Sequence, residues 1–221
     1  MTETAVSAHR RGLFLRFLVA GIVLGLWFWT QSLIGARTAP TSGIGDALHN
    51  LTAGLNSYFD QNTSAANALL IISSALIDAL GFFLLACWLL GGSVRPFFGL
   101  CLLMALRQLM QAICTLPPPP NMIWHYPGVP SLLVTYQVAN DFFFSGHTAI
   151  AVFGAIELSS LRRSWLTVLA VLIVVFEVST VLVLRAHYTM DVFTGIVAAL
   201  WVARLSERVS PRIDQFFSGS N

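Results

Sequence analysis

Two short stretches of this sequence place histidine and aspartate together at the mouths of apolar runs. In "RAHYTMDVFTG", residues 185–195, His187 and Asp191 are four positions apart, so on a helix they lie on one face. A carboxylate bonded to one imidazole nitrogen fixes the tautomer and raises the basicity of the other nitrogen. This spacing fits a histidine prepared as a nucleophile or a base. It fits equally a capped helix start with an interfacial histidine.

The second stretch is "DFFFSGHTAI", residues 141–150. Ser145 and Gly146 bring His147 to the start of an apolar helix, where free N–H groups attract anions. Two histidines and an aspartate at matching depth indicate a site, and a lone structural histidine becomes the weaker interpretation. Two histidines with Asp191 would also suit zinc, but the spacing of Asp191 favours orienting His187, so we predict no metal and no other cofactor.

Composition identifies the elements that must position these groups as membrane helices. Of 221 residues, 56% are hydrophobic and only 10% are charged, and the mean hydropathy is +0.75. A soluble domain carries about 25% charged residues. The net charge of +2 is spread over loop ends, which excludes a nucleic-acid-binding surface. The three cysteines lie inside apolar stretches, and we expect no disulfide.

We therefore predict an all-α polytopic membrane protein with a single membrane domain over 1–221. Each spanning helix needs about 20 mostly apolar residues. Six transmembrane helices are expected over 13–35, 66–91, 96–115, 142–161, 164–184 and 188–205. Residues 44–59 repeat apolar side chains at helical spacing with polar residues between them, which predicts an amphipathic helix lying in the interface.

Arginine counting gives the orientation, because inner loops carry the excess of positive charge. With the N-terminus inside, only Arg37 and Arg185 fall on the outer side. The inner side then holds Arg10, Arg11, Arg16, Arg95, Arg162, Arg163, Arg204, Arg208 and Arg212. Both termini are thus predicted to be cytoplasmic, and both histidine stretches extracytoplasmic. Short loops and the absence of lysine and of a retention signal favour a bacterial inner membrane.

Several further polar residues are candidates for substrate contacts. Arg185 is at the outer face beside His187, where it would bind phosphate or serve as an interfacial anchor. Arg107 lies inside an apolar helix, where a charge costs roughly 2.5–3.5 kcal/mol. It would pair with Asp78 or Glu177, or reach the phosphate. Asp141 would meet a cationic head group such as choline, or simply cap the fourth span.

Five other residues complete the predictions from the sequence. Glu157, about 15 Å below His147 by helix rise, is expected to have a structural role. Ser145 and Tyr188 join the substrate-binding candidates because they adjoin the two histidines. His125 and His49 have the character of ordinary polar loop residues.

The motifs resemble those of a known enzyme superfamily. "SGHT" with "HYTMD" resembles the second and third signature motifs of the lipid phosphatase/phosphotransferase superfamily. "NDFFFSGHT" is similar to the sphingomyelin synthases, and "LRQLMQAICTLPPPPNM", residues 106–122, to the first motif of that group. "RAHYTMDVFTG" and the stretch from "ELSSLRR" onward are closest to the plant phosphatidylcholine:diacylglycerol cholinephosphotransferases. The resemblance covers about 105–205.

The resemblance implies a mechanism and a pair of lipid partners. His187 would attack phosphorus and carry a phosphohistidine, Asp191 would orient it, and His147 would act as acid and then base. The donor would be a phospholipid carrying phosphocholine or phosphoethanolamine, and the acceptor diacylglycerol or ceramide, without a metal. The lipid phosphatases carry a lysine in their first motif, which this chain lacks, and an arginine where it has Val181. These departures favour head-group transfer over hydrolysis.

Two alternatives stay open. A lipid phosphatase or phospholipase C-like hydrolase would share the chemistry up to phosphohistidine. A non-catalytic transporter or scaffold would use the intramembrane charges to line a path. The sequence does not indicate an oligomeric state.

Overall fold

The structure is a computed structural model, and it describes residues 22, 25, 28, 29, 32, 43–91, 93–136 and 142–218. Apart from five isolated positions, the predicted first span, 13–35, lies outside the described residues, as does Asp141. Residues from Asp46 onward form one compact unit.

All regular secondary structure in the described part of the chain is helical, which confirms the predicted class. It contains seven helices and no strand: α2 (Ala47–Leu51), α3 (Ala53–Gln61), α4 (Thr63–Gly91), α5 (Arg95–Ile113), α6 (Gly146–Ser159), α7 (Ser164–Val183) and α8 (Thr189–Ser218). Four of these, α4, α5, α7 and α8, are long and apolar enough to cross a membrane. They coincide with four of the six predicted spans, and the protein is a membrane protein.

The predicted fourth span, 142–161, differs from the observed α6. This helix has 14 residues, fewer than the roughly 20 that a span needs. It begins late because Ser145, in extended conformation, accepts a hydrogen bond from the Thr148 N–H and caps the helix. Eleven of its residues are buried, and it contacts α4, α5, α7 and α8. Its apolarity therefore reflects a central position in the bundle, and six spans are not confirmed.

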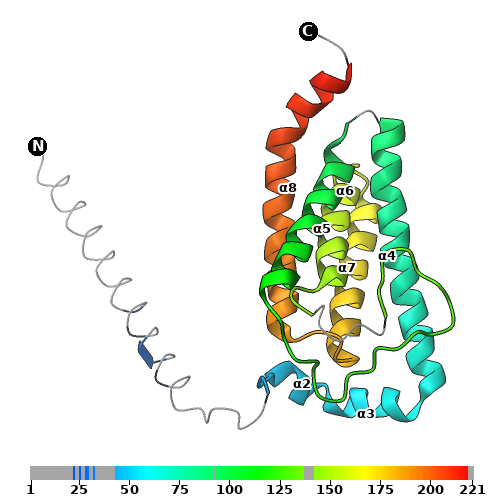
Figure 1. Ribbon diagram of the computed structural model, residues 1–221, viewed down its shortest axis with the longest axis vertical. Helices are drawn as coiled ribbons and strands as arrows, with labels where there is room; N and C mark the ends of the chain where they lie inside the picture. The colour runs from blue at the N-terminus through cyan, green and yellow to red at the C-terminus, as the bar shows by residue number, and fades with distance from the viewer. Residues whose placement is uncertain are drawn as a thin grey trace, which may run out of the picture. The chain divides into compact units, whose positions relative to one another are not determined.

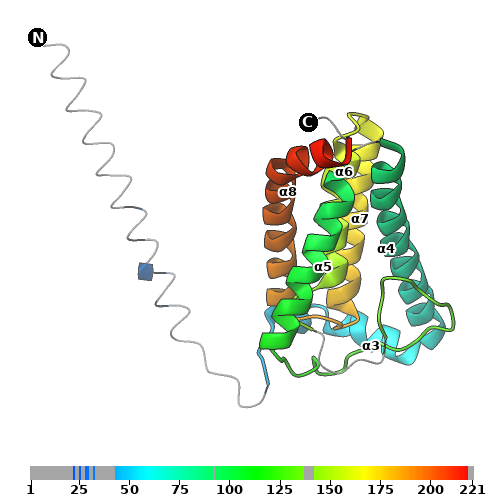
Figure 2. The same ribbon diagram turned by 45° about the horizontal axis from the view of Figure 1, so that its top comes forward.

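Helices α4, α5, α6, α7 and α8 run side by side, with α2 and α3 across one end of the bundle (Figure 1). The turned view shows the same arrangement (Figure 2). The α2–α3 end also holds the start of α6, the end of α7 and the start of α8. Both histidine stretches therefore lie at this end, as the orientation of the helices predicts.

Three acidic residues inside the bundle have specific partners. Glu157 forms an ion pair with Arg95 at 3.0 Å, in agreement with a structural role. Glu177 accepts a hydrogen bond of 2.6 Å from Ser73. Asp78 accepts hydrogen bonds from the segment that begins at Ser131. Each of these acidic side chains thus has a partner inside the protein, as expected for polar groups at membrane depth.

The predicted interfacial helix, 44–59, is two short helices that meet at Thr52. Their apolar residues face outward, since Leu51 is 80% and Leu55 55% exposed. Their buried residues are His49 and Asn56. The apolar face is thus available to a membrane interface, while the polar face holds the protein together. The prediction that His49 is an ordinary loop residue was wrong.

Candidate active site

The third motif places a carboxylate directly behind a histidine. His187 precedes α8 and Asp191 lies in its first turn. Asp191, fully buried, accepts the Tyr188 backbone N–H at 2.9 Å through Oδ2, the atom that lies 3.7 Å from His187 Nδ1. That distance is a charge contact, longer than a hydrogen bond. Because the carboxylate faces Nδ1, Nε2 is the ring nitrogen left for a substrate.

The second motif packs directly onto the third. The Ser145 backbone N–H donates to the Asp191 carbonyl at 3.2 Å. A Cβ at Gly195 would lie 2.8 Å from the Ser145 carbonyl oxygen, so only glycine lets α8 approach this closely. His147, in the first turn of α6, packs edge-on against Trp124 with ring centroids 5.1 Å apart. The two stretches therefore meet.

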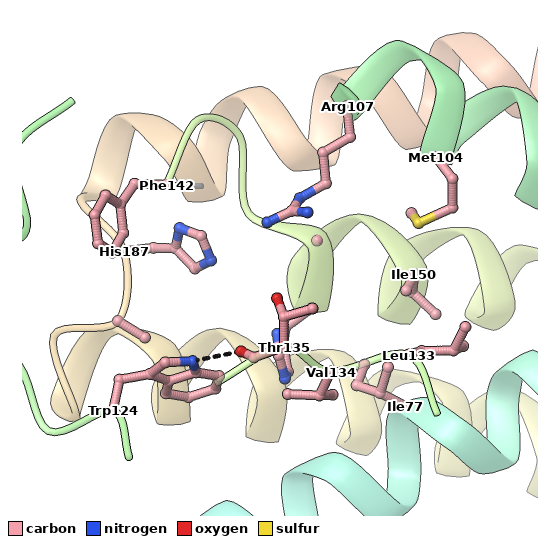
Figure 3. Close-up of a pocket in the computed structure, with 13 residues that line it drawn as sticks. Ile77, Met104, Arg107, Trp124, Leu133, Val134, Thr135, Phe142, Ile150 and His187 are labelled. Atoms are coloured by element: carbon pink, nitrogen blue, oxygen red, sulfur yellow. Dashed lines mark hydrogen bonds between the residues drawn. The ribbon is translucent and has the colours of Figure 1, made fainter. Parts of the chain in front are cut away.

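His147, His187 and Arg107 line one pocket. Figure 3 shows the side chains of Arg107 and His187 pointing into it. The Arg107 Nε–H donates to the Phe144 carbonyl at 3.0 Å. A Cβ at Gly146 would lie 3.0 Å from that nitrogen, so the glycine makes room for the guanidinium at the start of α6. A cation, two imidazoles and a helix N-terminus together suit an anionic group.

Buried polar atoms at the site lack hydrogen-bond partners among the described residues. They include His147 Nε2, His187 Nδ1 and Asp191 Oδ1. Buried polar atoms normally have partners. His187 Nδ1 faces the Asp191 carboxylate, which leaves His147 Nε2 as the candidate for contact with a ligand in the pocket. Within 43–91, 93–136 and 142–218 no group of three or more histidine, cysteine or acidic residues could hold a metal ion.

Arg107, and not Arg185, is the arginine of the pocket. The Arg185 guanidinium donates to the Pro120 carbonyl at 2.9 Å and to the His49 carbonyl at 3.2 Å. The residue has a positive φ of 53°, and it does not line the pocket of His187. Glu177 and Asp78, the acidic residues predicted as partners of Arg107, have other partners. Glu177 binds Ser73, and Asp78 binds the segment that begins at Ser131.

The remaining predicted site residues surround the pocket. Ser145 acts as the N-cap of α6. Tyr188 is buried, stacks on His49 with centroids 5.7 Å apart, and donates to the Pro118 carbonyl at 3.4 Å. Both hold the loops that carry the histidines, and neither lines the pocket.

Two residues that the sequence did not single out fix the backbone of the loop that carries His187. His49 Nε2 lies 2.9 Å from the His187 carbonyl oxygen. Asp46 accepts the Thr189 backbone N–H at 2.6 Å and its hydroxyl at 2.7 Å. Burial raises the pKa of the Asp46 carboxyl, but the hydrogen bonds from Thr189 outweigh it and hold the pKa below its ordinary value. Asp46 is therefore ionised at neutral pH.

Comparison with known proteins agrees with this geometry. The family model AtPDCT1/2 matches residues 45–208. The fold is similar to that of the crystal structure of Aquifex aeolicus LpxE, with a TM-score of 0.50 and 16% sequence identity over 64% of this chain and 85% of that one. No curated protein sequence matches the chain.

A membrane helix bundle with these motifs belongs to the lipid phosphatase/phosphotransferase superfamily. Within that superfamily, the chain is a member of the AtPDCT1/2 family, the phosphatidylcholine:diacylglycerol cholinephosphotransferases.

Proposed function

We propose that this protein moves a phosphocholine or phosphoethanolamine head group from a glycerophospholipid to diacylglycerol, with ceramide as the second acceptor. The observation that carries the proposal is the shared pocket of His147, His187 and Arg107, with Asp191 behind His187. Membership of the cholinephosphotransferase family supports it.

In the first step, His187 Nε2 attacks the phosphorus of the donor. The bond from phosphorus to the glycerol oxygen breaks, and that oxygen takes its electron pair and a proton from the His147 imidazolium. Burial and the nearby His187 and Arg107 lower the pKa of His147 to about 3, so its imidazolium forms only when the negative phosphate of the donor lies beside it. Arg107 and the N–H groups at the start of α6 stabilise the charge on the transferring group. Diacylglycerol leaves, and the head group stays on His187 as a phosphohistidine.

In the second step, neutral His147 accepts the proton of the incoming lipid hydroxyl. The hydroxyl oxygen attacks phosphorus, and the phosphorus–nitrogen bond breaks to restore His187. Both steps use only groups of the protein and its substrates. Water in place of the lipid hydroxyl would give hydrolysis, which is the second candidate.

The site is proposed to face the extracytoplasmic side. The described arginines at the end of the bundle away from α2 and α3 are those at the start of α5, between α6 and α7, and in the second half of α8 (Figure 1). They are Arg95, Arg162, Arg163, Arg204, Arg208 and Arg212. This excess of positive charge is typical of the cytoplasmic side, and with a bacterial inner membrane it gives a site open to the periplasm.

The experiment uses purified protein in detergent with phosphatidylcholine labelled in its head group and excess EDTA. One sample contains donor alone, one adds short-chain diacylglycerol, and one adds ceramide. Label appearing in short-chain phosphatidylcholine or in sphingomyelin supports transfer and identifies the acceptor. Free phosphocholine at equal rates in all three samples would instead support the hydrolase, and no reaction with this donor or with phosphatidylethanolamine would contradict both.

The contact between His49 of α2 and the backbone carbonyl of His187 gives a separate prediction. His49→Ala removes the bond to the His187 carbonyl, and we expect kcat to fall about 5-fold, because losing one hydrogen bond costs about 1 kcal/mol and misplaces the nucleophile. KM should change less, since His49 does not line the pocket. Steady-state kinetics of transfer measure both constants.

The matched control is His125→Ala, which removes a loop histidine that is hydrogen-bonded to Asn67 of α4. Its kcat should stay near that of the wild type. His49→Gln, whose amide can still donate to the carbonyl, should recover most of the lost rate. Equal losses in His49→Ala and His49→Gln would argue against positioning through this bond.

A further inference from the structure

Residues 131–136, the re-entrant segment, run without helical structure at membrane depth. The segment is bound to Asp78, which lies about 22 Å along α4 from Thr63 by helix rise. A Cβ at Gly81, in the next turn of α4, would overlap Leu133 Cδ1. Both views show the chain before α6 reaching along α4 and returning (Figures 1 and 2).

The segment also lies deeper than the catalytic histidines. Leu80, beside Gly81, is the neighbour that a Cβ at Gly154 would meet, at 2.9 Å. Gly154 is about 10 Å farther along α6 than His147 by helix rise. The Leu133 side chain is therefore near the level of Gly154, roughly two turns below the imidazoles.

Irregular backbone at this depth needs partners from the protein, and Asp78 supplies them. Its carboxylate accepts the backbone N–H groups of Leu132 and Leu133, each at 2.9 Å, and the Ser131 hydroxyl at 3.0 Å. Ser131 Oγ in turn accepts the Val134 N–H at 3.1 Å. This is the role of a charge in α4 that the mechanism does not use.

Farther along the segment, the Thr135 carbonyl accepts the Trp124 indole N–H at 3.0 Å, and the Tyr136 hydroxyl bonds Ser74. The segment is thus fixed at both ends to α4 and to the loop that packs on His147.

Neighbouring residues of the segment face opposite ways. Leu132 is 71% exposed, whereas the next three residues line the catalytic pocket (Figure 3). The charged and ring-nitrogen groups of the pocket lie toward one end, the polar end: Arg107 and His187 with Phe142 beside them (Figure 3), and His147 packed on Trp124. The other, apolar end is lined by Ile77, Met104, Leu133, Val134 and Ile150.

A phosphate held at the polar end leaves the apolar end for the group to which it is esterified. In the proposed reaction that group is diacylglycerol, both as leaving group and as acceptor. We propose that the re-entrant segment is the wall of an acyl-chain subsite, which takes the glycerol backbone and the first methylenes of one acyl chain. Its specificity-determining residue is Leu133. The proposal rests on the proposed function, because it names the part of the lipid substrate that this pocket selects.

The test compares Leu133→Trp with the matched control Leu132→Trp, which adds the same side chain to the exposed neighbour. Each variant is assayed with dioleoyl phosphatidylcholine and with p-nitrophenyl phosphocholine, which has no acyl chain. Leu133→Trp should lower kcat/KM for the long-chain donor at least about 10-fold, because the larger side chain fills the space that the acyl chain would occupy. It should change the rate with the chainless substrate less than about threefold, and Leu132→Trp should change neither.

Equal losses of both activities in Leu133→Trp, or no loss of either, would overturn the subsite. A binding measurement separates this failure from failure of the proposed function. Diacylglycerol with a diazirine near the carbonyl end of one acyl chain should crosslink to the segment in the wild type and in Leu132→Trp, and less in Leu133→Trp. Crosslinking there without any transfer activity would retain the subsite and reject the transferase. Transfer activity with crosslinks only elsewhere would reject the subsite alone.

Discussion

Replacing His187 by alanine is expected to lower head-group transfer by more than about 10⁴-fold, since loss of a covalent nucleophile leaves only the residual rate from binding and charge stabilisation. The other histidine of the pocket, His147, is not placed in the same way, because it lies on α6 and no carboxylate among the described residues contacts its ring as Asp191 contacts that of His187. Transfer of labelled phosphocholine to short-chain diacylglycerol measures the loss.

The intermediate gives a second readout for the same variant. Quenching the wild type after mixing with labelled donor alone should leave label bound to the protein, stable in alkali and released by acid, as a phosphohistidine is. His187→Ala should carry none, and His125→Ala should behave as the wild type. Transfer that persists in a correctly folded His187→Ala protein would contradict a covalent route through this residue.

The part of the site that the sequence predicts well is local in the chain. The four-residue spacing of His187 and Asp191 is converted by the first turn of α8 into a contact between ring and carboxylate. Helices entering from the same end of the bundle then bring His147 to the same pocket. Both steps need only helix geometry and the direction of each span.

The choice between the two arginines could not be made in this way. Arg185 is two residues from His187, but its guanidinium binds the carbonyl groups of Pro120 and His49 and does not line the pocket. Arg107, forty residues before His147, reaches the pocket because Gly146 leaves space for it. Such pairings depend on tertiary contacts between distant segments, for which hydropathy carries no signal.

The length of α6 and the role of Asp78 could not be predicted from the sequence for a related reason. An apolar run predicts burial, but it does not separate burial in lipid from burial among other helices, and α6 is enclosed by four of them. Likewise, an aspartate in an apolar helix predicts a partner without naming it. The partner is a backbone segment more than fifty residues away. The apolar side chains of Leu132 and Leu133 do not indicate that their backbone N–H groups bind a carboxylate.

Replacing His147 by alanine is expected to lower the rate with phosphatidylcholine far more than the rate with p-nitrophenyl phosphocholine. With phosphatidylcholine the leaving group is a basic alkoxide that needs a proton, so the rate of transfer should fall about 10²–10⁴-fold, the usual contribution of a general acid or base. With p-nitrophenyl phosphocholine the leaving group departs without protonation. Formation of phosphohistidine from that substrate, followed as the burst of p-nitrophenol, should therefore stay within about tenfold of the wild-type rate.

The two steps can then be distinguished in the same variant. After a normal burst, His147→Ala should accumulate phosphohistidine, because no base is left to activate the hydroxyl of diacylglycerol. The wild type should turn the intermediate over when diacylglycerol is added. If His147 served only to hold the start of α6, both substrates would lose the same factor and no intermediate would build up. The ratio of the two losses is therefore the quantity that assigns His147 to proton transfer.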